Sequence, residues 1–465
     1  MSVGKLLGVV ALVCLAGCTR MQSAPPVKPK LAHPVGEIKP TERIRPDCPI
    51  RLGGVFLMGL GDSSDAFEES ATNGVKLSNP NRDWLAAHCD LAALSPNTIA
   101  PDTFPTLRNR QLLFTPLLYL YASSLYEQPG HKGNVGGWKP EMSAWTLRDH
   151  TGAEIKHPDP GGHWMDFGNT LWATHWRKQT EALSRQFGSF GAVAAEMPLG
   201  NTFVGNDLEK YKTPEDRGAA TEAWLKTAID PGKYLLIPSS IEFEESTGHP
   251  TPLYPPGTAE PELVGRYWDQ FHTVTDGAWA ENWIRPYYWV ENTTSDRSKE
   301  ITAADSLWEI QMEAADRAAR TDKVFIAMAA YQTDAELEYL LASYLMTAKR
   351  QSRVVFQPMP LRPGQPPNAG MSLAVLKREV AEKSTYFDVP LGVALQERHA
   401  LTLQDGPVWR RAYQFGDVYV NSDDHRSVTV ELGSKMLRVN GKIVQRFVLA
   451  PHRGAILRYV APEKK

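Results

Sequence analysis

Cysteine is scarce in this 465-residue chain, which contains only four, and their spacing excludes the common cysteine-based sites. No Cys-x-x-Cys pair or Cys/His spacing of a structural metal site occurs, so we expect no metal. No Gly-rich loop follows the first apolar segment, and no Gly-x-Ser-x-Gly segment occurs, which disfavours a dinucleotide-binding fold and an esterase. Basic runs are also missing and the formal net charge is −3, which argues against a nucleic-acid partner. We expect no cofactor.

Long apolar runs are missing as well, apart from one short run at the N-terminus. Residues 6–15 follow Lys5 and are too short to cross a bilayer as a permanent helix, which is typical of a signal-peptide core. The run ends in Leu15-Ala16-Gly17-Cys18, which resembles the lipobox of bacterial lipoproteins. The resemblance implies that residues 1–18 are a lipoprotein signal peptide and that the thiol of Cys18 carries a diacylglycerol. An ordinary secretory signal that happens to contain a cysteine is the alternative.

The segment after Cys18 predicts how the protein is attached. Residues 19–46 are Pro-rich and nearly free of aromatics, which indicates a disordered tether. Lipid chains anchor through the burial of their CH₂ groups, so we expect a membrane partner and a location in the cell envelope. Thr19 stands where an Asp would suggest inner-membrane retention, so the outer membrane is favoured over the inner membrane.

The remaining sequence alternates short apolar segments with amphipathic stretches, which predicts an α/β fold. Eight segments suit buried parallel strands: 50–58, 89–95, 111–121, 190–196, 233–239, 273–280, 323–331 and 352–357. Helical patterns separate most of them, at 171–186, 213–228, 261–271, 303–320 and 334–350, and a helix is weakest between the second and third strands. Eight such units predict a (β/α)8 TIM-type barrel over residues 47–400. A doubly wound sheet is the alternative.

The pattern changes near the C-terminus. From Val408 onward apolar residues alternate at period two, and Asn440-Gly441 separates two such runs, which is a strong signal for a β-hairpin. We therefore predict a small antiparallel β domain over residues 401–465.

Acidic residues at the ends of two predicted strands are the candidates for catalysis. The fourth strand stops at Glu196, with Ala192 and Ala194 on the same face, so the carboxylate is expected to point into the barrel mouth. The sixth strand carries Asp276 and Glu281. Two carboxylates across a sugar ring are what glycoside hydrolysis requires. The alternative is that each acid only bonds a nearby Lys or a backbone N–H.

Aromatic and polar residues near these strand ends are the candidates for substrate binding. Aromatic rings stack on the apolar faces of sugars, and several cluster around the sixth strand. The candidates are Trp279, Trp283, Asp62, Tyr331 and Asn201. The loop over residues 122–168 is unusually long and contains Trp138, Trp145 and Trp164, and long barrel loops are usually functional.

Three segments resemble a family of putative glycoside hydrolase-like barrel proteins. They are Trp164-Met-Asp166-Phe-Gly-Asn169, Asp276-Gly-Ala-Trp-Ala-Glu281-Asn282 and the run from Trp409 to Asn421. The resemblance implies a reaction class and no particular substrate. Phe190 replaces an acidic residue often found in the fourth strand of that family, so the role of this strand depends on Glu196 alone.

These observations favour a membrane-tethered glycosidase that cleaves an envelope or extracellular polysaccharide or oligosaccharide. In this hypothesis Glu281 is the general acid because nearby Trp residues desolvate it, Glu196 is the nucleophile or base, and Asp276 orients one of them or contacts substrate. A non-catalytic glycan-binding lipoprotein on a degenerate barrel is the first alternative. A different barrel hydrolase or lyase is the second.

Two cysteines remain once the signal peptide and its lipidated residue are set aside. Cys48 precedes the first strand and Cys89 begins the second, and consecutive barrel strands are usually neighbours. In an oxidising compartment we expect a Cys48–Cys89 disulfide, with two buried thiols as the alternative.

Overall fold

The computed structural model describes residues 47–61, 76–157, 159–195, 208, 210–211, 214–230, 233–239, 274–281, 283–284, 305–348, 352–361 and 371–460. The expected signal peptide, Cys18 and the tether lie outside these residues, as do Asp62, Glu196 and Asn201. No helix in the described part of the chain is long and apolar enough to cross a membrane.

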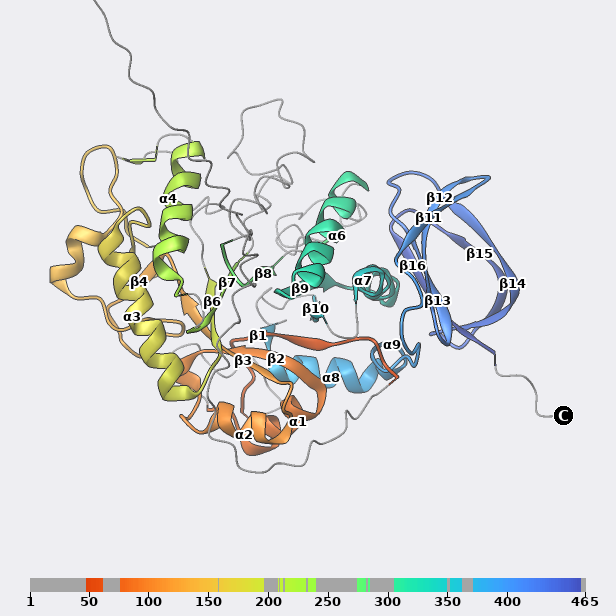
Figure 1. Cartoon of the computed structure of the whole chain (residues 1–465), viewed down its shortest axis with the longest axis horizontal. Coiled ribbons are helices and arrows are strands. Elements are labelled where there is room, and N and C mark those ends of the chain that lie inside the picture. Colours follow the sequence, from red (N-terminus) through yellow and green to blue (C-terminus); the bar gives the residue numbers. More distant parts are fainter. Residues whose placement is uncertain are drawn as a thin grey trace, which may run out of the picture. The chain divides into compact units, whose positions relative to one another are not determined.

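All eight expected barrel strands are present, and they are parallel. They are β1 (Leu52–Phe56), β2 (Cys89–Leu94), β3 (Thr115–Tyr121), β6 (Gly191–Ala195), β7 (Leu235–Pro238), β8 (Gly277–Ala280), β9 (Val324–Tyr331) and β10 (Arg353–Pro360). Their order is β7-β6-β3-β2-β1-β10-β9-β8 (Figure 1). A parallel bridge between Ser239 and Trp279 joins the two ends of this order. The sheet is therefore a near-closed TIM-like barrel, and the doubly wound alternative is wrong.

Helices surround the strands because each strand presents apolar side chains on both faces. The helices are α1 (Asn79–His88), α2 (Thr103–Arg110), α3 (Thr170–Phe187), α4 (Pro214–Ala228), α6 (Asp305–Arg320), α7 (Asp334–Thr347), α8 (Leu373–Glu382) and the short α9 (Ser384–Phe387). Inward residues such as Val55, Val193 and Ile326 fill the barrel, while their neighbours in sequence pack against helices. The connection between the second and third strands, where the helical pattern is weakest, does contain a helix, α2.

A side chain helps to join the first and last barrel strands of the chain, β1 and β10, which are neighbours in the sheet. The side-chain amide of Gln357 donates to the Val55 carbonyl oxygen at 2.8 Å and accepts from the Val55 N–H at 2.9 Å. Gly54, at φ 153°, provides the room, because a Cβ there would lie 2.2 Å from the Gln357 side-chain oxygen. At Val55 the side-chain amide of Gln357, and not the backbone of β10, forms the hydrogen bonds between the two strands.

The long loop after β3 forms an excursion with its own small sheet. Strands β4 (Ser124–Tyr126) and β5 (Gly162–Trp164) pair antiparallel. Two 3₁₀ turns, Pro96–Thr98 after β2 and Pro140–Trp145 within the excursion, begin with proline. We use the name β3 excursion for residues 122–168.

The C-terminal part is an antiparallel sheet, as expected. Its strands are β11 (His399–Leu403), β12 (Gly406–Tyr413), β13 (Gly416–Asn421), β14 (Val428–Arg438), β15 (Ile443–Leu449) and β16 (Arg453–Tyr459), in the order β11-β12-β13-β16-β14-β15. The turn at Asn440-Gly441 joins β14 to β15, with Gly441 at φ 83°, a left-handed conformation that favours glycine. This confirms the hairpin expected from the sequence.

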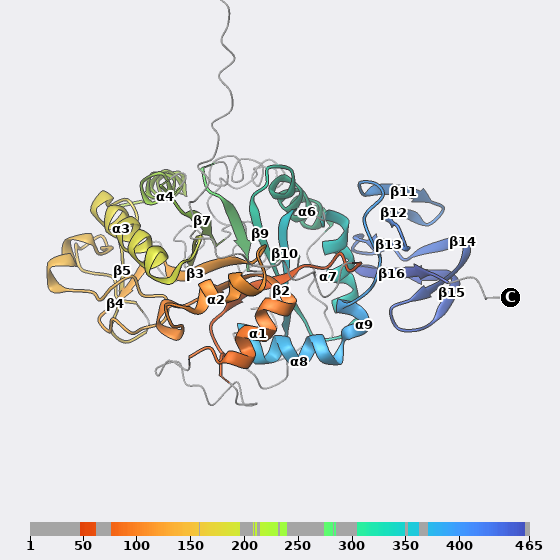
Figure 2. The same ribbon diagram turned by 60° about the horizontal axis from the view of Figure 1, so that its bottom comes forward.

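Helix α7 lies between the barrel and the C-terminal sheet (Figures 1 and 2). Nearly all of its residues are buried, which explains why its sequence is apolar around its whole circumference. Arg411 of β12 reaches the end of α7, where its guanidinium donates to the carbonyl oxygens of Leu345 at 2.7 Å and Ala348 at 2.9 Å. A cation at this position donates hydrogen bonds to carbonyl oxygens that the helix end leaves unpaired, and it is attracted to the negative end of the helix dipole.

The expected Cys48–Cys89 disulfide is wrong in this structure, where both cysteines of the described chain are buried thiols. The strand register explains why. Cys89 lies opposite Leu52, not Cys48, in the β1–β2 pairing, so four residues of extended chain separate the two positions. The Cys48 thiol instead points at the Phe387 carbonyl oxygen at 3.0 Å.

Candidate active site at the carboxyl ends of the barrel strands

Asp276 and Glu281, which were expected to work together, lie at opposite ends of β8. Asp276 precedes the strand, where its carboxylate accepts from the Leu236 N–H at 3.0 Å and its own N–H donates to the Leu236 oxygen at 3.0 Å. Its carbonyl oxygen accepts from the Val324 N–H at 2.9 Å. Asp276 therefore joins β7, β8 and β9 at their amino ends, and this position does not support the catalytic role predicted for it.

Glu281 follows β8 directly, at the carboxyl end where TIM-barrel active sites lie. Ala278 and Ala280 face the surrounding helices, whereas Trp279 faces the barrel interior. Glu281 lies in the turn that follows the strand and is half-buried. Its end of the strand is the one required of a catalytic acid in such a barrel.

The face assigned to the fourth strand needs correction. Ala192 and Ala194 of β6 pack among the helices, while Val193 and Ala195 face the interior, which is the reverse of what we expected from the sequence. Glu196 itself, with Asp62 and Asn201, lies outside the described residues, so its role stays a prediction.

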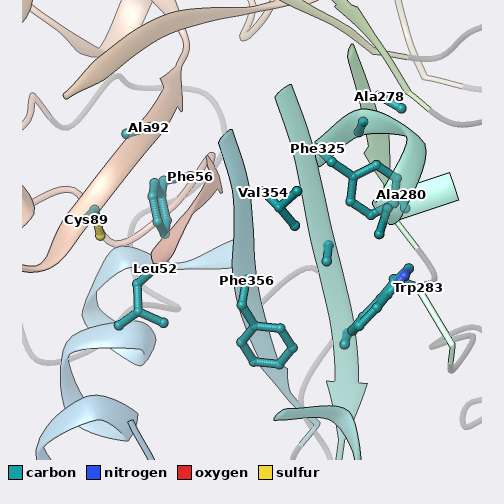
Figure 3. Close-up of a cluster of buried hydrophobic side chains, with 14 of the residues drawn as sticks. Leu52, Phe56, Cys89, Ala92, Ala278, Ala280, Trp283, Phe325, Val354 and Phe356 are labelled. Carbon is teal, nitrogen blue, oxygen red and sulfur yellow. The ribbon is translucent and has the colours of Figure 1, made fainter. Parts of the chain in front are cut away.

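Three of the residues expected to bind substrate are buried in the structure. Trp279 is 1% exposed inside the barrel, and Trp283 is 1% exposed on the helix side, in the cluster with Ala280 and Phe356 (Figure 3). Tyr331 is also buried, and its hydroxyl donates to the Glu379 carboxylate at 2.9 Å. None is an exposed sugar platform, so their burial does not support the binding role predicted for Trp283 and Tyr331. The closeness of these aromatic residues in the sequence did not show which of them lie in the core and which lie at the surface.

Trp279 still contributes to the site, as part of its floor. Its ring meets Tyr119 of β3 edge-to-face at 6.2 Å between centroids. The buried indole N–H of Trp279 has no hydrogen-bond partner among the described residues. It lies two positions before Glu281, which follows β8 directly.

Sequence reasoning missed the aromatic residues of β3 and the excursion. Tyr121 lies at the carboxyl end of β3, 5.5 Å from Tyr119 and 5.8 Å from the His131 ring. The His131 ring stacks on Tyr126 at 3.6 Å with 9° between the planes. The sequence signals were the two tyrosines near the end of the predicted third strand and the unusual length of the loop that carries Tyr126 and His131.

Hydrogen bonds from the backbone and from side chains hold the loop around His131 at the ends of three strands. The Tyr121 N–H donates to the Gly133 carbonyl oxygen at 2.8 Å, and the Gly133 N–H donates to the Ser95 hydroxyl at 3.2 Å. Lys132 reaches across to β1, where its Nζ donates to the Leu57 carbonyl oxygen at 2.8 Å. Gly133 has φ 72°, and a Cβ there would lie 2.9 Å from the Tyr119 ring. Only glycine suits both the conformation and the space.

Burial keeps two histidines of the excursion uncharged near neutral pH. Desolvation lowers the pKa of His131 and of His157, although the nearby Asp159 carboxylate acts in the opposite direction on both. The rings that line this part of the site are therefore neutral stacking partners. No three His, Cys, Asp or Glu side chains converge as metal ligands within the described ranges.

Asp166, from the first of the family-like segments, has a structural role. Its buried carboxylate forms an ion pair with Lys210 at 2.9 Å and accepts a hydrogen bond from the Tyr211 hydroxyl. Burial and this carboxylate raise the pKa of Tyr211 well above its usual value. Asp166 thus fixes the chain after β6 against the β3 excursion.

Comparison with known proteins finds only distant structural similarities. No protein-family profile matches it, and no curated protein sequence matches it. The glycoside hydrolase domain of PelA from Pseudomonas aeruginosa is 12% identical over 63% of this chain and 95% of that domain, with a TM-score of 0.38. An α-amylase from Malbranchea cinnamomea is 9% identical over 88% of this chain and 96% of that chain, with a TM-score of 0.44.

A third structure, Amy13B from Eubacterium rectale, is 9% identical over 90% of this chain and 97% of that chain, with a TM-score of 0.46. The chain is thus distantly similar in structure to glycoside hydrolase barrels. This likeness assigns no residue and no substrate.

Proposed function

We propose that this protein is a glycoside hydrolase that cleaves a polysaccharide of the envelope or its surroundings. The observation that carries the proposal is the position of Glu281. It directly follows the carboxyl end of β8, the strand whose inward-facing Trp279 meets Tyr119 of β3. A half-buried carboxyl group suits protonation of a glycosidic oxygen, because a less hydrated site favours its neutral form.

The proposed mechanism uses two carboxyl groups. Glu281 donates its proton to the leaving glycosidic oxygen as the bond to the anomeric carbon breaks. Glu196 is the candidate for the second carboxyl group, which either attacks that carbon or removes a proton from the attacking water. This assignment rests on its place directly after β6 in the sequence and not on strand parity, since Ala192 and Ala194 face the helices. Asp276 takes no part, because it lies at the amino end of β8.

The proposal includes attachment to a membrane. The Leu-Ala-Gly-Cys segment ending at Cys18 supports lipidation, and Thr19 supports the outer membrane over the inner membrane. An anchored enzyme of this kind acts on glycans within reach of its tether.

Glu281→Gln tests the catalytic role. Hydrolysis of a panel of envelope and extracellular polysaccharides should fall about 10²–10⁴-fold, because the amide supplies no proton. Glu431→Gln is the matched control, since Glu431 is an exposed residue of the C-terminal sheet that pairs with Arg446. Glu196→Gln tests the second carboxylate in the same assay. Full activity in Glu281→Gln contradicts the assignment, and binding without turnover by the wild type supports a non-catalytic glycan-binding protein instead.

A further inference from the structure

Three half-buried aromatic rings of β3 and its excursion share one construction. Tyr121, His131 and Trp138 are each partly accessible, and each rests on a ring that is almost completely buried. His131 stacks on Tyr126 at 3.6 Å and 9°, and Trp138 stacks on His163 at 3.9 Å and 3°. The Tyr121 ring contacts Tyr126 at 5.5 Å. Each accessible ring is therefore held in place from behind.

Polar contacts hold the two buried rings, Tyr126 and His163, in position. The His163 ring lies between two carboxylates, with Nδ1 2.5 Å from Glu154 and Nε2 3.4 Å from Glu127. The Tyr126 hydroxyl donates to the Asp159 carboxylate at 3.3 Å, and its carbonyl oxygen accepts from the Trp138 N–H at 2.9 Å. Rings held this way lose little conformational entropy when a ligand stacks on them.

The rings continue the barrel site outward. Contacts run from Trp279 to Tyr119 at 6.2 Å, from Tyr119 to Tyr121 at 5.5 Å, and from Tyr121 to His131 at 5.8 Å. Trp138 is not part of this row, because the ring on which it stacks, His163, pairs with Leu125 and so lies on the opposite face of the β4–β5 sheet from Tyr126. The row therefore runs from Trp279 of β8 to His131 of the β3 excursion.

We propose that Tyr121 and His131 form a short aromatic track that binds successive sugars of an uncharged glycan chain. Neutral flat rings match the apolar C–H faces of pyranoses. The Asp159 carboxylate, which accepts from the Tyr126 hydroxyl, has a side chain 65% exposed. It suits hydroxyl donors and disfavours an anionic chain. The inference rests on the proposed function and deepens it, because it assigns an uncharged glycan as the substrate class.

Binding as a function of chain length tests the track. Glu281→Gln protein is titrated calorimetrically with malto-, cello- and chito-oligosaccharides from the disaccharide to the heptasaccharide, and with oligogalacturonides as an anionic probe. Affinity for one uncharged series should rise with length. Tyr121→Ala and His131→Ala should weaken heptasaccharide binding about tenfold and leave disaccharide binding unchanged.

Matched variants separate the loss of a ring from damage to the fold. Tyr121→Phe keeps the ring and should bind as the parent does. Trp145→Ala removes another half-buried Trp of the excursion, whose ring leans on His175 at 5.6 Å and 49°, and should have no effect. The thermal midpoint of each variant identifies any that does not fold.

The outcomes distinguish this inference from the proposed function. Affinity independent of chain length, unchanged binding in both alanine variants, preference for oligogalacturonides, or no binding to any probe would overturn the track. Hydrolysis by Glu281→Gln at the parental rate would overturn the catalytic assignment alone, since the titrations measure binding without turnover.

Discussion

At the scale of single residues, two acids on one short strand have different roles because they lie at its two ends. Asp276 bonds the backbone of β7 at the amino end of β8, and Glu281 lies at the carboxyl end. The sequence did not show that Asp276 precedes the strand, because the predicted strand began at residue 273 whereas the observed strand begins at Gly277.

Replacing Asp276 with Ala should destabilise the fold by about 1–3 kcal/mol, because the buried Leu236 N–H loses its charged acceptor. Asp276→Asn keeps an oxygen acceptor and should cost less. Urea unfolding of both variants measures the free energy, and hydrolysis per folded molecule should be unchanged. An inactive Asp276→Asn with wild-type stability would show that the structural interpretation is mistaken.

The histidines of the excursion make stability depend on pH. Burial lowers the pKa of His131 and His157, so the unfolded chain takes up protons below about pH 6.5 while the folded rings stay neutral. Their contribution is therefore present above that pH and is lost as the pH falls through the folded pKa values. His131→Gln should reduce the loss of stability between about pH 7 and pH 5.

Urea midpoints at the two pH values measure this change, and His150→Gln at an exposed position of the same excursion is the control. An identical pH slope in His131→Gln and wild type would mean that His131 does not titrate differently on unfolding.

At the scale of elements, the sequence predicts the strands well because buried parallel strands are short continuous apolar runs. All eight were found, and the hairpin at Asn440-Gly441 was found because only a few residue pairs suit such a turn. The site was predicted less well. Trp283 and Tyr331 are buried, and the stacked rings of the β3 excursion come from segments whose pairing depends on long-range contacts. The amino-acid sequence does not show which faces of an aromatic ring are buried against other side chains.

The contact between α7 and the C-terminal sheet should contribute strongly to stability. Arg411 is 2% exposed and donates to three carbonyl oxygens, those of Leu345, Ala348 and Gln396. Arg411→Ala leaves these oxygens without a charged donor and should lower the free energy of unfolding by about 3 kcal/mol. A lysine cannot reproduce the planar fork of donors, so the free energy of unfolding of Arg411→Lys should lie between those of the wild type and Arg411→Ala. Thermal unfolding checks the order, and equal midpoints for all three proteins would contradict it.

At the scale of the whole molecule, the lipobox predicts where the protein resides. Cys18→Ser removes the thiol that accepts the diacylglycerol and should abolish incorporation of labelled fatty acid. Fractionation of cells should then show less protein in the outer-membrane fraction than for wild type. Cys48→Ser, which alters a buried thiol of the barrel, is the control for loss of a cysteine. Labelling that persists in Cys18→Ser would exclude lipidation at this residue.

The bond between Gln357 and Val55 also has a consequence for the order in which the chain folds. β1 is the first barrel strand to be synthesised, and its partner on one side is the last, with 302 positions between the two bonded residues. Until β10 arrives, one edge of β1 has no partner strand, and an unpaired edge invites association with other chains. Contacts of such long sequence separation also form slowly. Ring closure is therefore a late event, and a nascent chain that stops short of residue 357 exposes the edge that the finished barrel covers.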